Sequence, residues 1–463
     1  MKQLIALMLC LMAPGWIAAA PKVKDQFATL DVQPAPAPTP AMRYALLPEV
    51  AEMNPGNAVP AYLKSFAEQY RFFFLKESSD ERERLLKCPL TDIKPGQLKE
   101  YGGHALRQAD HAARLEYADW NILPQLREQG PMLLLPEVQQ LRALADTLAV
   151  RGRGQLVDRD FEGAIGTLKT IFALARHMGD HPTLLTGLVG TAIAQKGLNL
   201  LEEYVQQSDA PNLYWALTDL PSPLVETRKA ASADRLMLDV LLGPHSDPKR
   251  VWTQEELPAV LKKATEVGTM LTEMTPDERQ AADAWAKERL TDEAWLADSR
   301  KYLTSRGYPE DAVAKYPAAQ VLYFKLFAQA RASHDEALKW INVPYWEAEP
   351  AYLELEKAPP GIEAKLGRST AFSIGVVRRA HVRLAQRLAL LRAVEAIRLD
   401  AARNGGKLPA SLSDLSVPVP PDPATGKPFS YKLEGITAML EAKPITVRDG
   451  TTTHYRYEVR LRK

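Results

Sequence analysis

The chain has 463 residues and a mass of 51.4 kDa, which gives room for two or three domains. Its 58 Lys and Arg residues balance 57 Asp and Glu residues, which excludes the broad basic excess of a dedicated nucleic-acid-binding protein. Hydrophobic residues make up 46% of the chain, which excludes a disordered polymer, and two cysteines exclude a disulfide scaffold or a cysteine-rich metal site.

Residues 1–19 have the pattern of a secretory signal peptide. Lys2 gives a positive start, an apolar run follows, and small residues allow cleavage after Ala19 or Ala20. An uncleaved anchor is the alternative, but the run is shorter than the roughly 20 residues of a membrane span. We expect no later segment to be long and apolar enough to span. The sequence therefore predicts an exported protein, periplasmic or extracellular, in which Cys88 has no intramolecular partner.

Four segments are predicted along the chain. The signal peptide over 1–19 is followed by a proline-rich linker over 20–41, a helical body over 42–358, and a long helix with a β-meander over 362–463. Within the linker, Pro alternates with other residues over 31–40. We therefore expect an extended, solvated tether with no core of its own.

The helical body is predicted to begin with a helix from Ala58 to Phe74, and its clearest pattern lies in the middle of the chain. Pro136 opens a helix with apolar residues at helical spacing, Asp160 caps the next one, which ends at Gly179, and Pro182 starts a third. The third helix contains three glycines, each of which costs about 1 kcal/mol relative to Ala. A close helix crossing is expected to compensate.

This helix pair resembles a tetratricopeptide unit. Gly152, Phe161, Ala164 and Leu168 stand where that repeat places its small and large packing residues. The match covers about one repeat, and the second helix is longer than the usual frame of roughly 34 residues. The fold class that we predict is mainly α, with a helical-repeat-like, tetratricopeptide-like bundle.

The last part of the chain changes from helical to strand periodicity. Start signals predict further helices at Ser222-Pro223 and at Thr275, which forms a capping box with Glu278. A long helix is expected from Thr370 to Arg403. Alternating residues then predict a small antiparallel meander, with a hairpin turn at Asp449-Gly450 before the final strand.

The segment after the long helix resembles the periplasmic half of type II secretion pseudopilins. The residues that carry this resemblance are Asn404-Gly405-Gly406-Lys407-Leu408-Pro409 and Asp422-Pro423-Ala424-Thr425-Gly426-Lys427-Pro428-Phe429. It implies a long helix packed on a small antiparallel sheet. A pseudopilin's hydrophobic N-terminal helix and processing site do not precede the segment, so we interpret it as a borrowed structural unit. Its turn has no acidic cluster beyond Asp422, and we predict no cofactor.

Nearly the whole chain also resembles a group of uncharacterised exported proteins of Planctomycetes-type bacteria. The residues that carry this second resemblance run from Arg43 to Pro48, from Asn54 to Ala58, from Pro211 to Leu217 and from Leu408 to Phe429. The resemblance implies export and no known activity.

Two histidine pairs are candidates for metal binding. His177 and His181 are four residues apart, the spacing that puts two imidazoles on one helical face. Gly179 and Pro182 suggest instead that the helix ends between them, which favours a capping or surface role. His104 and His111 could converge with Asp110, or lie on an ordinary exposed helix. We predict no metal site.

Glu347 and Glu349 lie beside Trp346 and suggest a sugar site. Paired carboxylates serve as acid and base in glycosidases, and aromatic faces stack on sugar rings. The alternative is that carboxylates two residues apart point away from each other and that the aromatic side chains belong to the core.

Arg379, Arg383 and Arg387 form one stripe on the long helix and are candidate binding residues. They could meet an anionic partner such as a lipid headgroup or an acidic protein. The alternative, which we favour, is pairing within the chain with the acid-rich stretch from Glu273 to Asp298.

The sequence predicts a non-catalytic interaction or scaffold protein of the bacterial cell envelope, with another envelope protein as its partner. Export, helical-repeat packing and the lack of a nucleophile elbow or phosphate loop favour this interpretation. The first alternative is an envelope polysaccharide hydrolase or sugar-binding protein that uses Glu347 and Glu349. The second is a soluble carrier of a small apolar ligand, which an empty apolar cavity would indicate.

Overall fold

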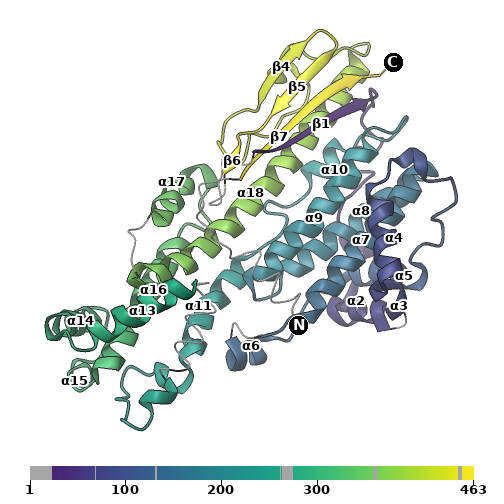
Figure 1. The fold of residues 1–463 in the computed structure, drawn as a ribbon. Helices are drawn as coiled ribbons and strands as arrows, with labels where there is room; N and C mark the ends of the chain where they lie inside the picture. The colour runs from purple at the N-terminus through teal and green to yellow at the C-terminus, as the bar shows by residue number, and fades with distance from the viewer. Residues whose placement is uncertain are drawn as a thin grey trace.

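The structure is a computed structural model, and it describes residues 23–67, 69–130, 133–260, 262, 275–357, 362–446 and 451–462. The chain is mainly helical, with a small sheet built mostly from its last strands, which confirms the predicted fold class (Figure 1). The tetratricopeptide-like repeat stays a prediction. The predicted signal peptide and the Asp449-Gly450 turn lie outside the described residues.

The first helices of the body are short. They are α2 (Ala58–Ala67), α3 (Tyr70–Phe74), α4 (Lys76–Lys87), α5 (Gly103–Ala113) and α6 (Leu123–Gln129), with the strands β2 (Asn54–Asn57) and β3 (Leu115–Tyr117) paired in parallel. The single helix predicted from Ala58 to Phe74 is therefore two helices. The backbone leaves the helical region at Gln69, with φ −129° and ψ 35°, and the ring of Phe73 turns back to pack 4.8 Å from that of Phe66.

Three long helices form the centre of the body, as the sequence predicts. They are α7 (Pro136–Val157), α8 (Phe161–Gly179), which Asp160 caps, and α9 (Leu184–Tyr204). Helix α9 starts two residues after the predicted Pro182, because the Thr183 hydroxyl caps it by accepting from Thr186 N–H. The expected close crossing is present, since a Cβ on Gly190 would lie 2.7 Å from the Ala175 carbonyl oxygen of α8.

Helix α9 is an exception to the expectation that no segment after the leader is long and apolar enough to span a membrane. Among the described helices it is long and apolar enough to cross a bilayer, which we did not expect of any segment after the leader. However, 67% of its apolar window is buried against neighbouring helices, as in the core helix of a helical body.

The chain then extends into a second helical region with a core of its own. The short helix α10 (Tyr214–Thr218) still packs on the main core. The helices that follow it are α11 (Arg228–Leu242), α13 (Pro276–Arg289), α14 (Glu293–Ser305), α15 (Glu310–Val313), α16 (Ala318–Leu338) and α17 (Tyr345–Glu356). Helix α13 starts with the predicted capping box of Thr275 and Glu278. Helix α11 starts at Arg228, later than the predicted Ser222-Pro223. Trp252, Leu296 and Phe324 belong to a core that is separate from the main one.

Helix α18 (Ile362–Arg403) runs through the molecule and joins its parts (Figure 1). It contacts α9 and α10 on one side, α16 and α17 along its length, and β7 of the sheet on the other. Its C-terminal half is buried almost all round, so polar residues there must find partners inside the protein.

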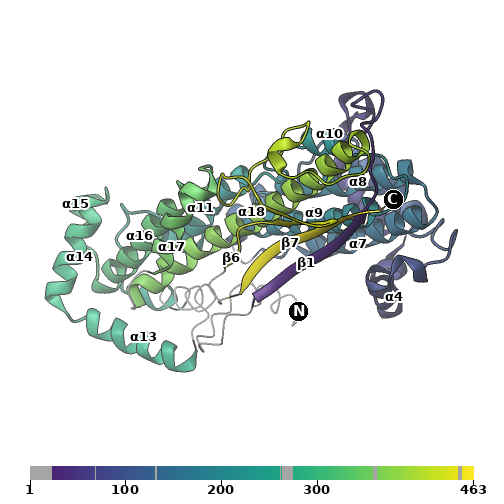
Figure 2. The same ribbon diagram turned by 90° about the horizontal axis from the view of Figure 1, so that it is seen from above.

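The sheet contains the first and the last strands of the described chain. Its order is β1 (Val23–Val32), β7 (Thr452–Leu461), β5 (Thr437–Glu441) and β4 (Ser430–Glu434), with β6 (Ile445–Thr446) also paired to β7. Figure 2 shows β1 alongside β7, and the two strands run parallel. The predicted antiparallel meander is therefore a mixed sheet.

The prediction of a solvated linker over residues 20–41 is wrong for residues 23–35, whereas residues 36–41 are exposed or half-buried. Leu30 and Val32 point into the core from β1, and Ala35 is buried after it. Alternation of apolar residues in β1 drives this pairing, and the N–H of Ala35 then donates to the carbonyl oxygen of Arg398 in α18 (3.0 Å). The segment is a part of the fold.

Candidate binding cavity

A cavity of about 310 Å³ lies on one face of α18. Ligand sites in proteins range from roughly 300 to 1,000 Å³ and are mostly apolar. The floor consists of helix residues at steps of three and four, which share one face: His381, Leu384, Ala385, Leu388, Ala389 and Arg392. The two alanines form a row of small side chains, here called the trough, beside the row of the two leucines, with His381 towards one end and Arg392 towards the other.

Two loops and one helix form the walls of the cavity. One wall runs from Leu217 at the end of α10 to Val225, and it includes Pro221 and Pro223. The other contains Pro420, Pro421 and Pro423, together with Trp346 of α17. Prolines fix the backbone and offer no N–H, so these walls are stiff and apolar.

Asp422 holds the second wall in place. Its side chain is 2% exposed, and it accepts hydrogen bonds from Ala424 N–H (2.8 Å), from Gln386 Nε2 (2.9 Å) and from Lys443 N–H (2.7 Å). These bonds tie the proline loop both to α18 and to the segment after β5. The motif that resembles the pseudopilin turn thus shapes the cavity.

Trp346 stands at the rim of the cavity, and the neighbouring carboxylates do not share its position. Its indole packs on Gly426, where a Cβ would lie 2.9 Å away, and its side chain is 41% exposed. Glu347 is exposed, and Glu349 forms an ion pair with Lys443. Neither lines the cavity. The structure therefore brings one of these three predicted site residues to the cavity.

The two polar ends of the floor differ in character. Arg392 is half-buried, with its guanidinium 5.2 Å from the centre of the Tyr214 ring and Nη2 donating to Tyr214 Oη (3.3 Å). His381 is buried, and its Nε2 has no hydrogen-bond partner among the described residues. Burial, together with the charge of Arg378, lowers the pKa of His381 to about 4. The imidazole is thus neutral at pH 7.

The three arginines of the α18 stripe have partners within the chain. Arg379 is 2% exposed and pairs with Glu356 (2.5 Å), while Arg387 is 7% exposed and pairs with Glu202 (2.6 Å). Arg383 donates to Thr453 Oγ1 in β7 (3.3 Å). The prediction of pairing within the chain is correct, but these described partners lie outside the stretch 273–298. Arg379 and Arg387 are buried because α18 is covered on both sides, and Arg383 is half-buried.

The histidine pairs form no described metal centre. His177 Nδ1 lies 2.9 Å from Tyr62 Oη, and His181 Nδ1 lies 3.1 Å from Thr183 Oγ1. Burial lowers the pKa of His177 to about 4 and that of His181 to about 3. No group of three or more His, Cys, Asp or Glu side chains that could hold a metal ion occurs within the described ranges.

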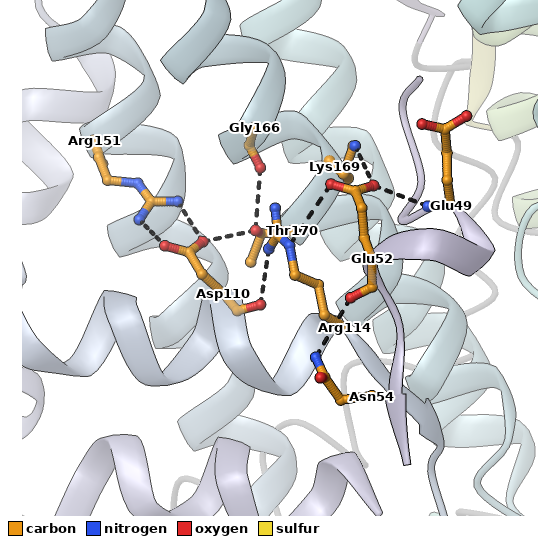
Figure 3. A network of polar contacts seen from close by, with 9 residues as sticks. All are labelled: Glu49, Glu52, Asn54, Asp110, Arg114, Arg151, Gly166, Lys169 and Thr170. Carbon is orange, nitrogen blue, oxygen red and sulfur yellow. Dashed lines mark hydrogen bonds and ion pairs between the residues drawn. The ribbon is translucent and has the colours of Figure 1, made fainter. Parts of the chain in front are cut away.

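Asp110, which we placed with His104 and His111, belongs instead to a network of charges (Figure 3). Its carboxylate accepts two hydrogen bonds from Arg151 (2.7 and 2.8 Å) and one from Thr170 Oγ1 (2.7 Å). Lys169 pairs with Glu52 in the same network (2.6 Å). These contacts join α5, α7 and α8, and each carboxylate is already satisfied, so the network is structural.

Comparisons of the chain with protein-family models, curated proteins and solved structures found no match. Inference about function therefore depends on the cavity and its lining.

Proposed function

We propose that this chain is a non-catalytic binding protein of the bacterial cell envelope that holds a small, largely apolar ligand in the cavity on α18. The observation that carries the proposal is a trough of Leu and Ala side chains between proline walls, at a volume suited to a small molecule. Location in the envelope depends on the signal peptide predicted over residues 1–19.

The alternative of a polysaccharide hydrolase has less support. A glycosidase needs two carboxylates that face each other across a substrate. Glu349 is paired with Lys443 and Glu347 points to solvent, both outside the cavity. Binding of another envelope protein stays a prediction, since neither the walls nor the floor of the cavity indicates a particular protein partner.

Fluorescence of an uncharged apolar dye, N-phenyl-1-naphthylamine, tests the proposal. We expect saturable binding at one site per chain, and we expect Ala385→Phe to abolish it because a phenyl ring fills the trough. Ala402 lies on the exposed side of the same helix, so Ala402→Phe is the matched control and should bind the dye normally. Lack of saturable binding, or equal binding by both variants, would overturn the proposal.

A further inference from the structure

The strongest unassigned feature is the charge at one end of the apolar trough. Among the described residues, Arg392 donates one hydrogen bond, to Tyr214, and forms no ion pair with a carboxylate. Other arginines of the same helix differ, since Arg387 and Arg398 pair with Glu202 and Glu395. Arg392 lines the cavity and is half-buried, and a guanidinium in such a place without a carboxylate partner favours an anionic ligand group.

The two polar residues at the ends of the trough lie far apart along α18. His381 and Arg392 are eleven residues apart on one helix, which places their Cα atoms about 16 Å apart along the axis at 1.5 Å per residue. The floor between them is apolar, and its small side chains, Ala385 and Ala389, lie in a row. A row of small side chains of this length suits a single extended chain better than a bulky ring system.

From this geometry we infer that the cavity takes an elongated amphipathic monocarboxylate, with its head at Arg392 and its hydrocarbon chain along Ala389 and Ala385 towards His381. The inference depends on the proposed function and names its ligand class. One guanidinium neutralises one negative charge and forms two parallel hydrogen bonds to a carboxylate. A phosphate monoester carries about 1.5 to 2 negative charges at pH 7 and would keep part of its charge unpaired in an apolar site.

Calorimetric titrations with decanoate, 1-decanol and decyl phosphate, each below its micelle concentration, distinguish the contribution of the head group to affinity from that of the hydrocarbon chain. We expect decanoate to bind about 10-fold more tightly than either of the others, because a hydrogen bond to a charged group is worth about that factor. Octanoate should bind about 15-fold more weakly than decanoate, given about 4-fold for each buried CH₂.

Arg392→Gln should weaken decanoate binding about 10-fold and leave 1-decanol unchanged within 2-fold. The matched control is Arg403→Gln, at the exposed end of the same helix, which should change neither affinity. Arg392→Lys keeps the charge but loses the paired N–H groups, so its affinity for decanoate should fall between those of the wild type and of Arg392→Gln. If the glutamine variant does not fold, a lysine variant that binds decanoate no more tightly than 1-decanol supports the head-group contact at Arg392, and one that binds decanoate as tightly as the wild type overturns it.

The outcomes separate the two proposals. Equal affinity for decanoate and 1-decanol in the wild type, or equal weakening of both by Arg392→Gln, overturns the carboxylate inference and leaves the apolar site intact. Tighter binding of decyl phosphate than of decanoate overturns the choice of head group. If neither the apolar dye nor any of the decyl compounds binds, the proposed function itself fails.

Discussion

Acid should destabilise this protein through its buried histidines, and His177 shows how. Burial, with the charge of Arg176, lowers the pKa of His177 to about 4 in the folded protein, whereas an imidazole in an unfolded chain titrates near ~6.5. Between these values the unfolded chain binds a proton that the folded chain does not bind. The free energy of unfolding is therefore highest above about pH 6.5 and falls as the pH drops towards 4.

The expected size of the effect follows from the pKa difference. Each histidine contributes a slope of about 1.4 kcal/mol per pH unit inside this window, so His177 costs about 2 kcal/mol between pH 7.5 and 5.0. His181 and His381 have pKa values of about 3 and about 4 for the same reason, burial, and each adds a similar cost. Together they remove about 6 kcal/mol, a large part of the 5–15 kcal/mol of a typical domain.

Urea unfolding of the wild type and of His177→Gln at pH 7.5 and 5.0 measures this cost. The glutamine amide can still accept a hydrogen bond from the Tyr62 hydroxyl, which lies 2.9 Å from His177 Nδ1. The variant should lose about 2 kcal/mol less than the wild type between the two pH values. His104→Gln controls for the loss of a histidine elsewhere. Equal losses in the wild type and His177→Gln would refute the reasoning.

Three further predictions concern stability and are measured by urea unfolding. Arg398→Leu should lower the free energy of unfolding by about 3–5 kcal/mol, because it leaves Glu395 buried without its partner 2.8 Å away. Replacing both residues by Leu should restore most of the lost stability, and a double variant as unstable as the single one would contradict the pairing argument. Gly190→Ala should cost about 1–3 kcal/mol, since its Cβ would meet a backbone oxygen of the facing helix, whereas Gly166→Ala, with open space around it, should gain about 1 kcal/mol. Asp422→Asn should cost about 2–3 kcal/mol, because an amide NH₂ replaces an oxygen that accepts a backbone N–H, and an unchanged stability would exclude this role.

Local signals in the sequence predicted much of the helical body. Asp160 caps α8 and the glycines of α9 mark a close crossing, because each of these signals acts within a few residues of itself. The strand β1 was missed since its partner, β7, lies at the other end of the chain. Alternation over residues 23–32 was present, but the prolines that follow it suggested a tether.

The candidate site could be predicted only in part. Trp346 was predicted as a site residue from its place in an aromatic cluster, and it lines the cavity. His381 and Arg392 were not predicted, because an arginine on a long helix usually faces solvent. The stripe of Arg379 and Arg387 was misplaced for a related reason. Helical periodicity separates one apolar face from one polar face, and α18 is covered on both.

The pairing of β1 with β7 has a consequence for how the chain folds. Asp25 of the first strand bonds Arg456 of the last, 431 positions further along. The sheet therefore cannot close until nearly the whole chain is available, and pairing two strands so far apart in sequence costs more loop-closure entropy than forming a local hairpin. For a protein whose sequence predicts export, this delay keeps the terminal strands unpaired while synthesis proceeds.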